Sequence, residues 1–394
     1  MKKLSLSVLG FYIGMLAAFS QKSQDTDSAY KSRKLKLEEV NLVSSYYRQD
    51  GNNATVTGGI GSEKLTDISN TVDLTISKYD RKYRKHKLTL EFGLDHYTSA
   101  SSDKIDPKTI SSASSEDTRF YPSLGWSVEN EKKGTTLGAG LSYSGEYDYS
   151  SIGANVSYSK KTNNRNGELI LKGQVFFDQV SLIYPEELRS GRGSQGSSSR
   201  NSISGAIGWN QIINKRLQLS IDAEIVSQHG YLSLPFHRVY FNDNSAHVEK
   251  LPSQRLKLPV GLRASYFIGD KFIVRSWYRF YHDDWGINSN AIQLETVVKI
   301  TPFFSITPFY RFYQQTGSTY FAPYREHTSA DEFYTSNYAL SEFNSHFLGA
   351  GVRIAPPKPL IKAIRLHSLE LRYGHYDRTT NLNANIISLH LKFK

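Results

Sequence analysis

The chain has 394 residues, no cysteine and a formal net charge of +11 at pH 7. The absence of cysteine excludes disulfides, thiolate metal sites and a lipid-modified cysteine anchor. The basic residues are spread along the sequence, with only local bunches such as Arg81 to Lys85. We therefore expect turn and lumen charges rather than a surface for nucleic acid.

The amino terminus has the pattern of a secretory signal peptide. A basic start, Met1-Lys2-Lys3, precedes an apolar run from Leu4 to about Phe19, and the small residue Ser20 stands before Gln21. This pattern predicts a cleaved signal peptide over 1–20. The alternative is an uncleaved membrane anchor, for which the run is short and interrupted by serine. The polar residues 21–34 are expected to form a flexible lead-in to a barrel over 35–394.

After the signal peptide, no apolar run approaches the ~20 residues that a membrane helix needs. Apolar and polar residues alternate instead, as in Leu88, Leu90 and Phe92 against Thr89 and Glu91. Such alternation is typical of strands with one apolar face. We count about sixteen candidate strands, an even number, as bacterial membrane barrels have. They cover 40–46, 72–76, 88–94, 120–128, 137–143, 152–158, 169–177, 203–209, 217–225, 256–266, 272–280, 292–298, 304–312, 348–354, 369–373 and 385–394.

The last candidate strand, Asn385-Lys394, suggests how the sheet is completed. Ile387, Leu389, Leu391 and Phe393 share one face of it. A strand at the end of a sheet leaves an unpaired edge, which pairing with the first strand would remove. The sequence therefore predicts an all-β, antiparallel, up-and-down transmembrane barrel.

The connections between candidate strands alternate between long and short. The first, about 50–67, is long and the second, about 80–85, is short. Every second connection, counted from the first, is expected at the same end of the barrel. The longest connections all belong to this set: Ser181–Arg200, His229–Ser253 and Thr316–Leu340. Within the set, only 146–149 and 283–288 are expected to be short. Long external loops and short periplasmic turns are typical of outer-membrane barrels. A soluble sandwich would fit the strands but not this regularity.

If the apolar faces contact lipid, the other faces line a lumen that carries both signs of charge. The acidic lumen candidates are Asp73, Glu91 and Asp95. Three arginines lie on nearby strands with three aromatic residues: Arg275, Arg279, Arg311, Trp277, Tyr281 and Tyr313. One interpretation is a basic, aromatic constriction that attracts anions. The alternative, which we favour, is a ladder of salt bridges that fixes the shape of the wall.

Other candidates for chemistry are less developed. Asp50 to Asn53 and the pair Asp283-Asp284 could offer oxygen ligands to calcium, although such residues are common in turns. Four histidines at strand ends could meet at a rim, but they lack metal-type spacing: His96, His282, His346 and His375. We expect no metal, no cofactor and no catalytic residues.

Several segments resemble a known family of outer-membrane barrels, the domain of unknown function DUF3570. They are 44–53 (SSYYRQDGNN), 56–63 (VTGGIGSE), 143–149 (YSGEYDY) and 310–315 (YRFYQQ). The resemblance covers essentially the whole mature chain and supplies no catalytic residues. It implies an outer-membrane part of an envelope redox or export system in Gram-negative bacteria. The signal peptide followed by Gln21 is similar to those of Bacteroidota.

These patterns predict an outer-membrane pore or transport component of the cell envelope that is not an enzyme. One alternative is a plugged structural or docking barrel for envelope redox or export proteins; another is an enzyme embedded in the barrel. Aromatic residues in the two longest connections predict either a packed plug or a binding surface. The expected partners are outer-membrane lipid, the barrel assembly machinery through Asn385-Lys394, and possible envelope redox proteins.

Overall fold

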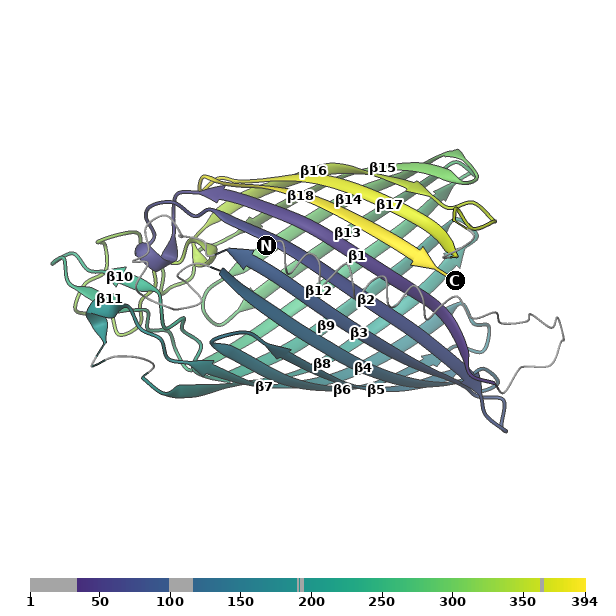
Figure 1. Ribbon diagram of the computed structural model, residues 1–394, viewed down its shortest axis with the longest axis horizontal. Helices are drawn as coiled ribbons and strands as arrows, with labels where there is room; N and C mark the ends of the chain where they lie inside the picture. The colour runs from purple at the N-terminus through teal and green to yellow at the C-terminus, as the bar shows by residue number, and fades with distance from the viewer. Residues whose placement is uncertain (1–33, 99–115, 190, 192–194, 362–364) are drawn as a thin grey trace.

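The computed structural model describes residues 34–98, 116–189, 191, 195–361 and 365–394 (Figure 1). The predicted signal peptide and all but the last residue of the predicted lead-in lie outside these ranges. The described residues form strands and three single 3-10 turns, η1 (Thr55–Thr57), η2 (Glu186–Leu188) and η3 (Tyr338–Leu340). None of these helical turns is long and apolar enough to cross a membrane.

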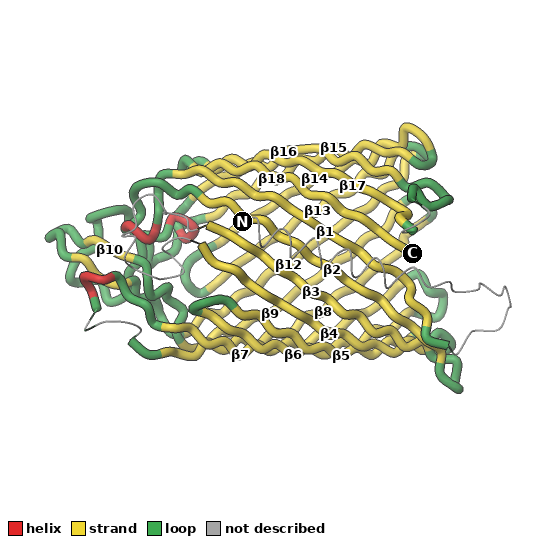
Figure 2. Tube along the Cα trace, viewed as in Figure 1, coloured by secondary structure: helices red, strands yellow, loops and turns green. Residues whose placement is uncertain are grey.

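Within the described residues, sixteen strands close into one antiparallel barrel, which confirms the predicted fold class (Figures 1 and 2). Each strand pairs with the strand before and after it, so the sheet is an up-and-down meander. A separate two-stranded ribbon, β10 (Arg238–Tyr240) with β11 (Ala246–Val248), lies in the connection between β9 and β12. The barrel strands are β1 (Lys36–Gly51), β2 (Leu65–Tyr79), β3 (Lys85–Thr98), β4 (Glu116–Asn130), β5 (Thr135–Gly145), β6 (Tyr149–Lys161), β7 (Gly167–Ser181), β8 (Ser197–Asn214), β9 (Leu217–Gly230), β12 (Gln254–Ile268), β13 (Phe272–Asp283), β14 (Asn288–Thr301), β15 (Phe304–Gln315), β16 (Phe343–Ile354), β17 (Leu366–Arg378) and β18 (Leu382–Phe393).

The seam of the barrel joins β1 to β18, as the terminal strand predicts. The pairing runs from Val40 opposite Phe393 to Gly51 opposite Leu382 without a break in register. On the inward face, the Asn41 Oδ1 atom lies 3.3 Å from the His390 Nε2 atom across the seam. Every barrel strand therefore has two neighbours, and no edge is left open.

The outer surface of the barrel is apolar. Leu141 and Val156 remain 60% and 63% exposed, which a soluble sandwich would not allow because its apolar faces pack against each other. Large aromatic side chains are among the exposed residues of this surface, and exposed aromatic residues are typical of membrane barrels. These include Tyr46, Phe120, Trp126, Tyr143, Tyr158, Trp209, Tyr266, Phe272, Tyr278, Tyr310 and Tyr373.

The two ends of the barrel differ as the connection lengths predict (Figure 2). The long-loop end carries the connections 52–64, 182–196, 231–253 and 316–342, and the short-turn end carries tight turns such as 215–216 and 302–303. The expectation of only two short connections at the long-loop end is wrong. Residues 379–381 make a third, and Asn381 has the positive φ of 57° that a tight hairpin turn requires.

Candidate functional site: the lumen, its walls and its cap

The predicted lumen charges lie on the inward faces of their strands. Arg279, for example, stands between Tyr278 and Phe280, which are exposed on the outer surface. Barrels of sixteen strands are wide enough to enclose an aqueous channel. Charged side chains on this face are therefore placed where water can solvate them.

Part of the predicted arginine cluster forms the salt-bridge ladder that the sequence leaves as an alternative. Arg275 Nη1 lies 3.0 Å from Glu295 Oε1, and Glu295 Oε2 lies 2.8 Å from Arg372 Nη2. Arg372 Nη1 lies 3.3 Å from Glu370 Oε1, and Arg353 Nε lies 3.9 Å from Glu370 Oε2. These five side chains come from β13, β14, β16 and β17, so the ladder ties neighbouring strands together along the wall.

A glycine on β16 lets one arginine of the ladder reach across two strands. Arg372 reaches from β17 to Glu295 on β14, and its guanidinium lies 4.9 Å from the ring centre of Phe309. A side chain at Gly351 would bring its Cβ within 2.9 Å of Arg372 Cγ. The absence of a side chain at Gly351 is therefore what allows Arg372 to lie flat along the wall.

Arg279 and Arg311 behave differently from Arg275. Both lie in the central parts of β13 and β15, and in the described residues neither has a carboxylate within 4 Å. Arg311 is held instead by stacking, with its guanidinium 5.0 Å from the ring centre of Phe347. Trp277 lies on the same face of β13, between Arg275 and Arg279. The two central arginines therefore keep their charge available to the lumen.

The two tyrosines of the predicted constriction lie nearer the long-loop end, where they support loops. The Tyr281 hydroxyl donates to Asp283 Oδ2 at 2.7 Å. The Tyr313 hydroxyl donates to Gln315 Oε1 at 2.6 Å, and the Gln315 amide donates to the Ser341 carbonyl at 2.6 Å. The six predicted residues thus lie at different depths along one wall and do not form a single ring.

The three acidic candidates lie on β2 and β3. Asp73 accepts a hydrogen bond from Asn41 Nδ2 at 2.9 Å, and Asp95 accepts one from the Tyr121 hydroxyl at 2.8 Å. Glu91 lines a cavity within the lumen. Among the described residues, none of the three carboxylates has an arginine or lysine within 4 Å. Neutral partners hold Asp73 and Asp95 without cancelling their charge.

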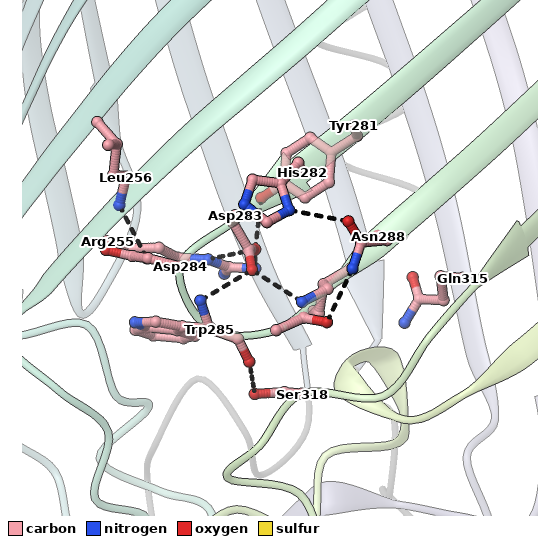
Figure 3. Close-up of polar contacts among 12 residues, drawn as sticks. Arg255, Leu256, Tyr281, His282, Asp283, Asp284, Trp285, Asn288, Gln315 and Ser318 are labelled. Carbon is pink, nitrogen blue, oxygen red and sulfur yellow. Dashed lines mark hydrogen bonds and ion pairs between the residues drawn. The ribbon is translucent and has the colours of Figure 1, made fainter.

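A buried ion pair organises the mouth of the barrel between β12 and β13 (Figure 3). Asp283 is 1% exposed, and its Oδ2 atom accepts from Arg255 Nε at 3.0 Å. Its Oδ1 atom accepts from the backbone N–H groups of Trp285 and Ile287, each at 3.0 Å. The Arg255 guanidinium also lies 4.3 Å from the Trp285 ring centre. Asp283 therefore uses both oxygens to hold the turn, and they do not project as ligands for calcium.

A layer of loops, here called the cap, covers part of the mouth. The cap comprises the connections 52–64, 182–196, 231–253 and 316–342 at the long-loop end (Figures 1 and 2). Arg238 Nη1 donates to the Val56 carbonyl at 2.7 Å, and the Cα of Gly58 faces the Tyr240 ring. The β1–β2 and β9–β12 connections stand eight strands apart in the ring of sixteen, so they emerge from opposite sides. Their contact means that the cap crosses the mouth.

The interior of the cap is packed like a small domain. Val239 and Thr335 are fully buried, and Glu249 accepts from Thr335 Oγ1 at 2.6 Å and from the Leu234 N–H at 2.7 Å. Aromatic rings surround this core, and Phe241 lies 4.9 Å from Tyr334 between ring centres. The aromatic residues that the sequence places in these connections therefore pack against one another.

A cavity of about 600 Å³ lies in the lumen beside the cap. Its polar lining includes Arg119, Asp178, Arg200, Arg255 and Lys257. Asp178 Oδ2 pairs with Arg200 Nε at 3.3 Å. Sequence reasoning missed Arg119, Arg200 and Arg255 because the predicted strands begin just after them. Extending the alternation by one to three residues would have placed all three on the inward face.

The four rim histidines do not meet. Their ring nitrogens bond to separate neighbours: His96 to Thr118, His282 to Asn288, His346 to Tyr310 and His375 to Asn385. Among the residues that the structure describes, no group of three or more histidine, aspartate or glutamate side chains could hold a metal ion. The rim therefore offers no assembled metal or catalytic centre in this part of the chain.

Comparisons with known proteins identify a family and several solved structures to which the chain is similar. The family model described as "Protein of unknown function (DUF3570)" matches residues 95–385. Acinetobacter baumannii OccAB1 has a similar fold, with a TM-score of 0.47, 10% identity, and coverage of 94% of this chain and 99% of that one. For a BenF-like porin from Pseudomonas fluorescens Pf-5 the TM-score is 0.44 and the identity 9%, with coverage of 92% of this chain and 100% of that one. For Pseudomonas aeruginosa OpdK, solved with vanillate, the TM-score is 0.43 and the identity 8%, with coverage of 92% of this chain and 99% of that one. No curated protein matches the chain.

Proposed function

The chain belongs to the DUF3570 family, and from this membership and the architecture of its barrel we propose that it is an outer-membrane channel for small polar solutes. In this proposal it catalyses no reaction, and its walls and cap determine which solutes pass. The apolar belt contacts the lipid of the outer membrane, the long-loop end faces outward and the short-turn end faces the periplasm.

One observation carries the proposal. Several charged side chains on the inward face of the barrel have no ion-pair partner among the described residues. They are Arg279 and Arg311 on β13 and β15, and Glu91 and Asp95 on β3. Charge that is neither paired nor solvated is strongly unfavourable. Such side chains therefore need water, and a water-filled lumen is what a channel requires.

The proposed assembly partner is inferred from the strand that closes the barrel. The strand β18 closes the barrel, and the segment Asn385-Lys394 that contains most of it is the proposed signal to the barrel assembly machinery. Its outward residues, such as Ile387, alternate with inward ones such as Ser388. The further partner in this proposal is an envelope redox or export protein at the outer or periplasmic rim.

Single-channel recording tests the proposal. The protein, folded in detergent, must first show the heat-dependent shift in gel mobility that a closed barrel gives. In a planar bilayer we expect stable conductance steps. A folded barrel that shows no conductance with its cap intact would contradict the channel.

The second candidate function is a docking barrel, which the cap favours. Loops from opposite sides of the barrel meet over the mouth through Arg238 and Val56, and they bury Val239 and Thr335 completely. A cap that closes the lumen fully would leave a scaffold. The two functions differ in one result: with the cap intact, a channel conducts and a scaffold does not.

A further inference from the structure

We propose that the lumen selects solutes that carry one positive and one negative group, such as amino acids and short peptides. This inference rests on the proposed channel function and names its substrate class. It depends on two groups of side chains. The acidic wall is Asp73, Glu91 and Asp95 on β2 and β3; the basic wall is Arg263, Arg279 and Arg311 on β12, β13 and β15.

The topology places the two walls across the lumen from each other. In the ring of sixteen strands, β3 stands eight positions from β13, and β2 stands eight positions from β12. Eight positions are half of the ring, so these strands face each other. Glu91 and Arg279 each lie near the middle of their strands, at similar depth. A solute that passes the centre of the lumen therefore has three carboxylates on one side and three guanidinium groups on the other, and the inward carboxylates of Asp222 and Glu224 on β9 stand beside the basic wall.

Both walls keep their charge. Asp73 and Asp95 accept hydrogen bonds from the neutral groups of Asn41 and Tyr121. In the part of the chain that the structure describes, the three residues of the basic wall have no carboxylate within ion-pair distance. The same barrel shows what a purely structural arrangement looks like, because the ladder from Arg275 to Arg353 interleaves opposite signs along one wall.

Opposed walls act differently from a single charged constriction. Low-dielectric walls around a narrow aqueous space focus the field of their charges. A solute with one kind of charge gains only at the wall of opposite sign, toward which the other wall also pushes it. A solute with both kinds of charge gains at both walls once it lies across the lumen. The arrangement therefore favours dipolar solutes, whereas the basic cluster alone would favour anions.

Three peptides of similar size separate these possibilities. Trialanine carries both terminal charges, N-acetyltrialanine only the negative one, and trialanine amide only the positive one. Each is added to the full-length protein conducting in a planar bilayer, and the blockade of the current is recorded. We expect trialanine to give blockades about tenfold longer than either single-charge form. Equal blockade by all three peptides, or the longest by N-acetyltrialanine, would overturn the inference.

Variants of each wall give the second test. Glu91→Gln with Asp95→Asn, and separately Arg279→Gln with Arg311→Gln, should each reduce the trialanine blockade to the level of a single-charge peptide. Lys172→Gln, an inward lysine of β7 outside both walls, is the matched control and should leave the preference unchanged.

The outcomes remain separable from those of the channel proposal. Each variant must show the heat-dependent gel shift, so a loss of folding is recognised before recording. A folded barrel that never conducts contradicts the channel itself. A conducting barrel whose peptide preference ignores both wall variants leaves the channel intact and overturns only the selection by opposed walls.

Discussion

Arg255 and Asp283 form an ion pair at the mouth of the barrel, with 14% and 0% of their side chains exposed. The pair joins β12 to the turn that follows β13. The Asp283 carboxylate also accepts two backbone N–H groups of that turn, and Trp285 covers the guanidinium. These two charges therefore hold the mouth together, while those deeper in the lumen remain available to solutes.

Replacing Asp283 should loosen the mouth. Asp283→Asn leaves the Arg255 charge buried without a counter-charge, which costs about 3–5 kcal/mol for a fully buried pair. We expect the free energy of unfolding, measured by urea titration in lipid vesicles, to fall by up to this amount. The control is Asp270→Asn in an exposed turn at the other end. An equal loss in both variants would contradict a specific role for the pair.

Separating the two opposed loops of the cap should open the mouth. Gly58 has a φ of 81°, and a Cβ there would lie 2.5 Å from the Tyr240 ring. Gly58→Val therefore cannot keep the contact between the β1–β2 and β9–β12 connections. We expect a higher mean single-channel conductance.

Gly269→Val is the matched control for this experiment. Gly269 also has a positive φ, 59°, but nothing lies within 4 Å of its Cβ position, in a turn at the short-turn end. The same backbone strain should leave the conductance unchanged there. If both variants alter the conductance equally, strain rather than the cap contact explains the effect.

The cap should loosen in acid. Burial alone would raise the pKa of Glu187, but hydrogen bonds from Arg238 outweigh it, so the pKa lies below the ordinary 4.5. A carboxylate with a depressed pKa stabilises the fold above its ordinary pKa, and this contribution is lost as the pH falls through the folded value. We expect Glu187→Gln to increase hydrogen exchange in 182–196 and 231–253 at neutral pH.

The difference depends on pH, because the wild-type carboxyl also becomes protonated as the pH falls through the folded pKa of Glu187. The difference between wild type and Glu187→Gln should shrink or disappear. Glu186→Gln, which changes an exposed neighbouring carboxyl, should show little difference at neutral or acidic pH. If the difference in hydrogen exchange between wild type and Glu187→Gln persists unchanged in acid, the ion pair with Arg238 is not its cause.

The outer belt should reject charge. Leu141 is 60% exposed at mid-strand on the outer face of β5. Leu141→Arg should lower the free energy of unfolding in lipid by about 2–4 kcal/mol. Gln174→Arg, at an inward position of β7, should cost much less. Equal losses would mean that the two faces have been assigned the wrong way round.

The alternation of side chains was enough to predict the barrel, its strand number and its closure. A strand exposes its residues to two environments in turn, so lipid and lumen leave a period of two in the sequence. The same pattern placed Arg279 and Asp95 on the inward face. The parity of the connections then distinguished the two ends.

What the sequence could not give depends on contacts between distant strands. Arg275 is paired because Glu295 lies beside it on β14, whereas Arg279 has no such neighbour among the described residues. Arg372 can join the same carboxylate because Gly351 leaves space for it. The meeting of Arg238 with Val56 over the mouth joins loops from opposite sides of the ring. No local pattern specifies such contacts, so the constriction and the cap could be proposed only in outline.

The seam between β1 and β18 also has a kinetic consequence. Asn41 and His390, which meet across it, are 349 residues apart in the chain. Contacts of such sequence separation form late, because the entropy of closing the loop must be overcome before they contribute stability. Until that step, the edges of β1 and β18 are available to other chains. During folding, closure of the barrel therefore competes with aggregation. Substitutions at the seam should affect the yield of folded protein more than its final stability.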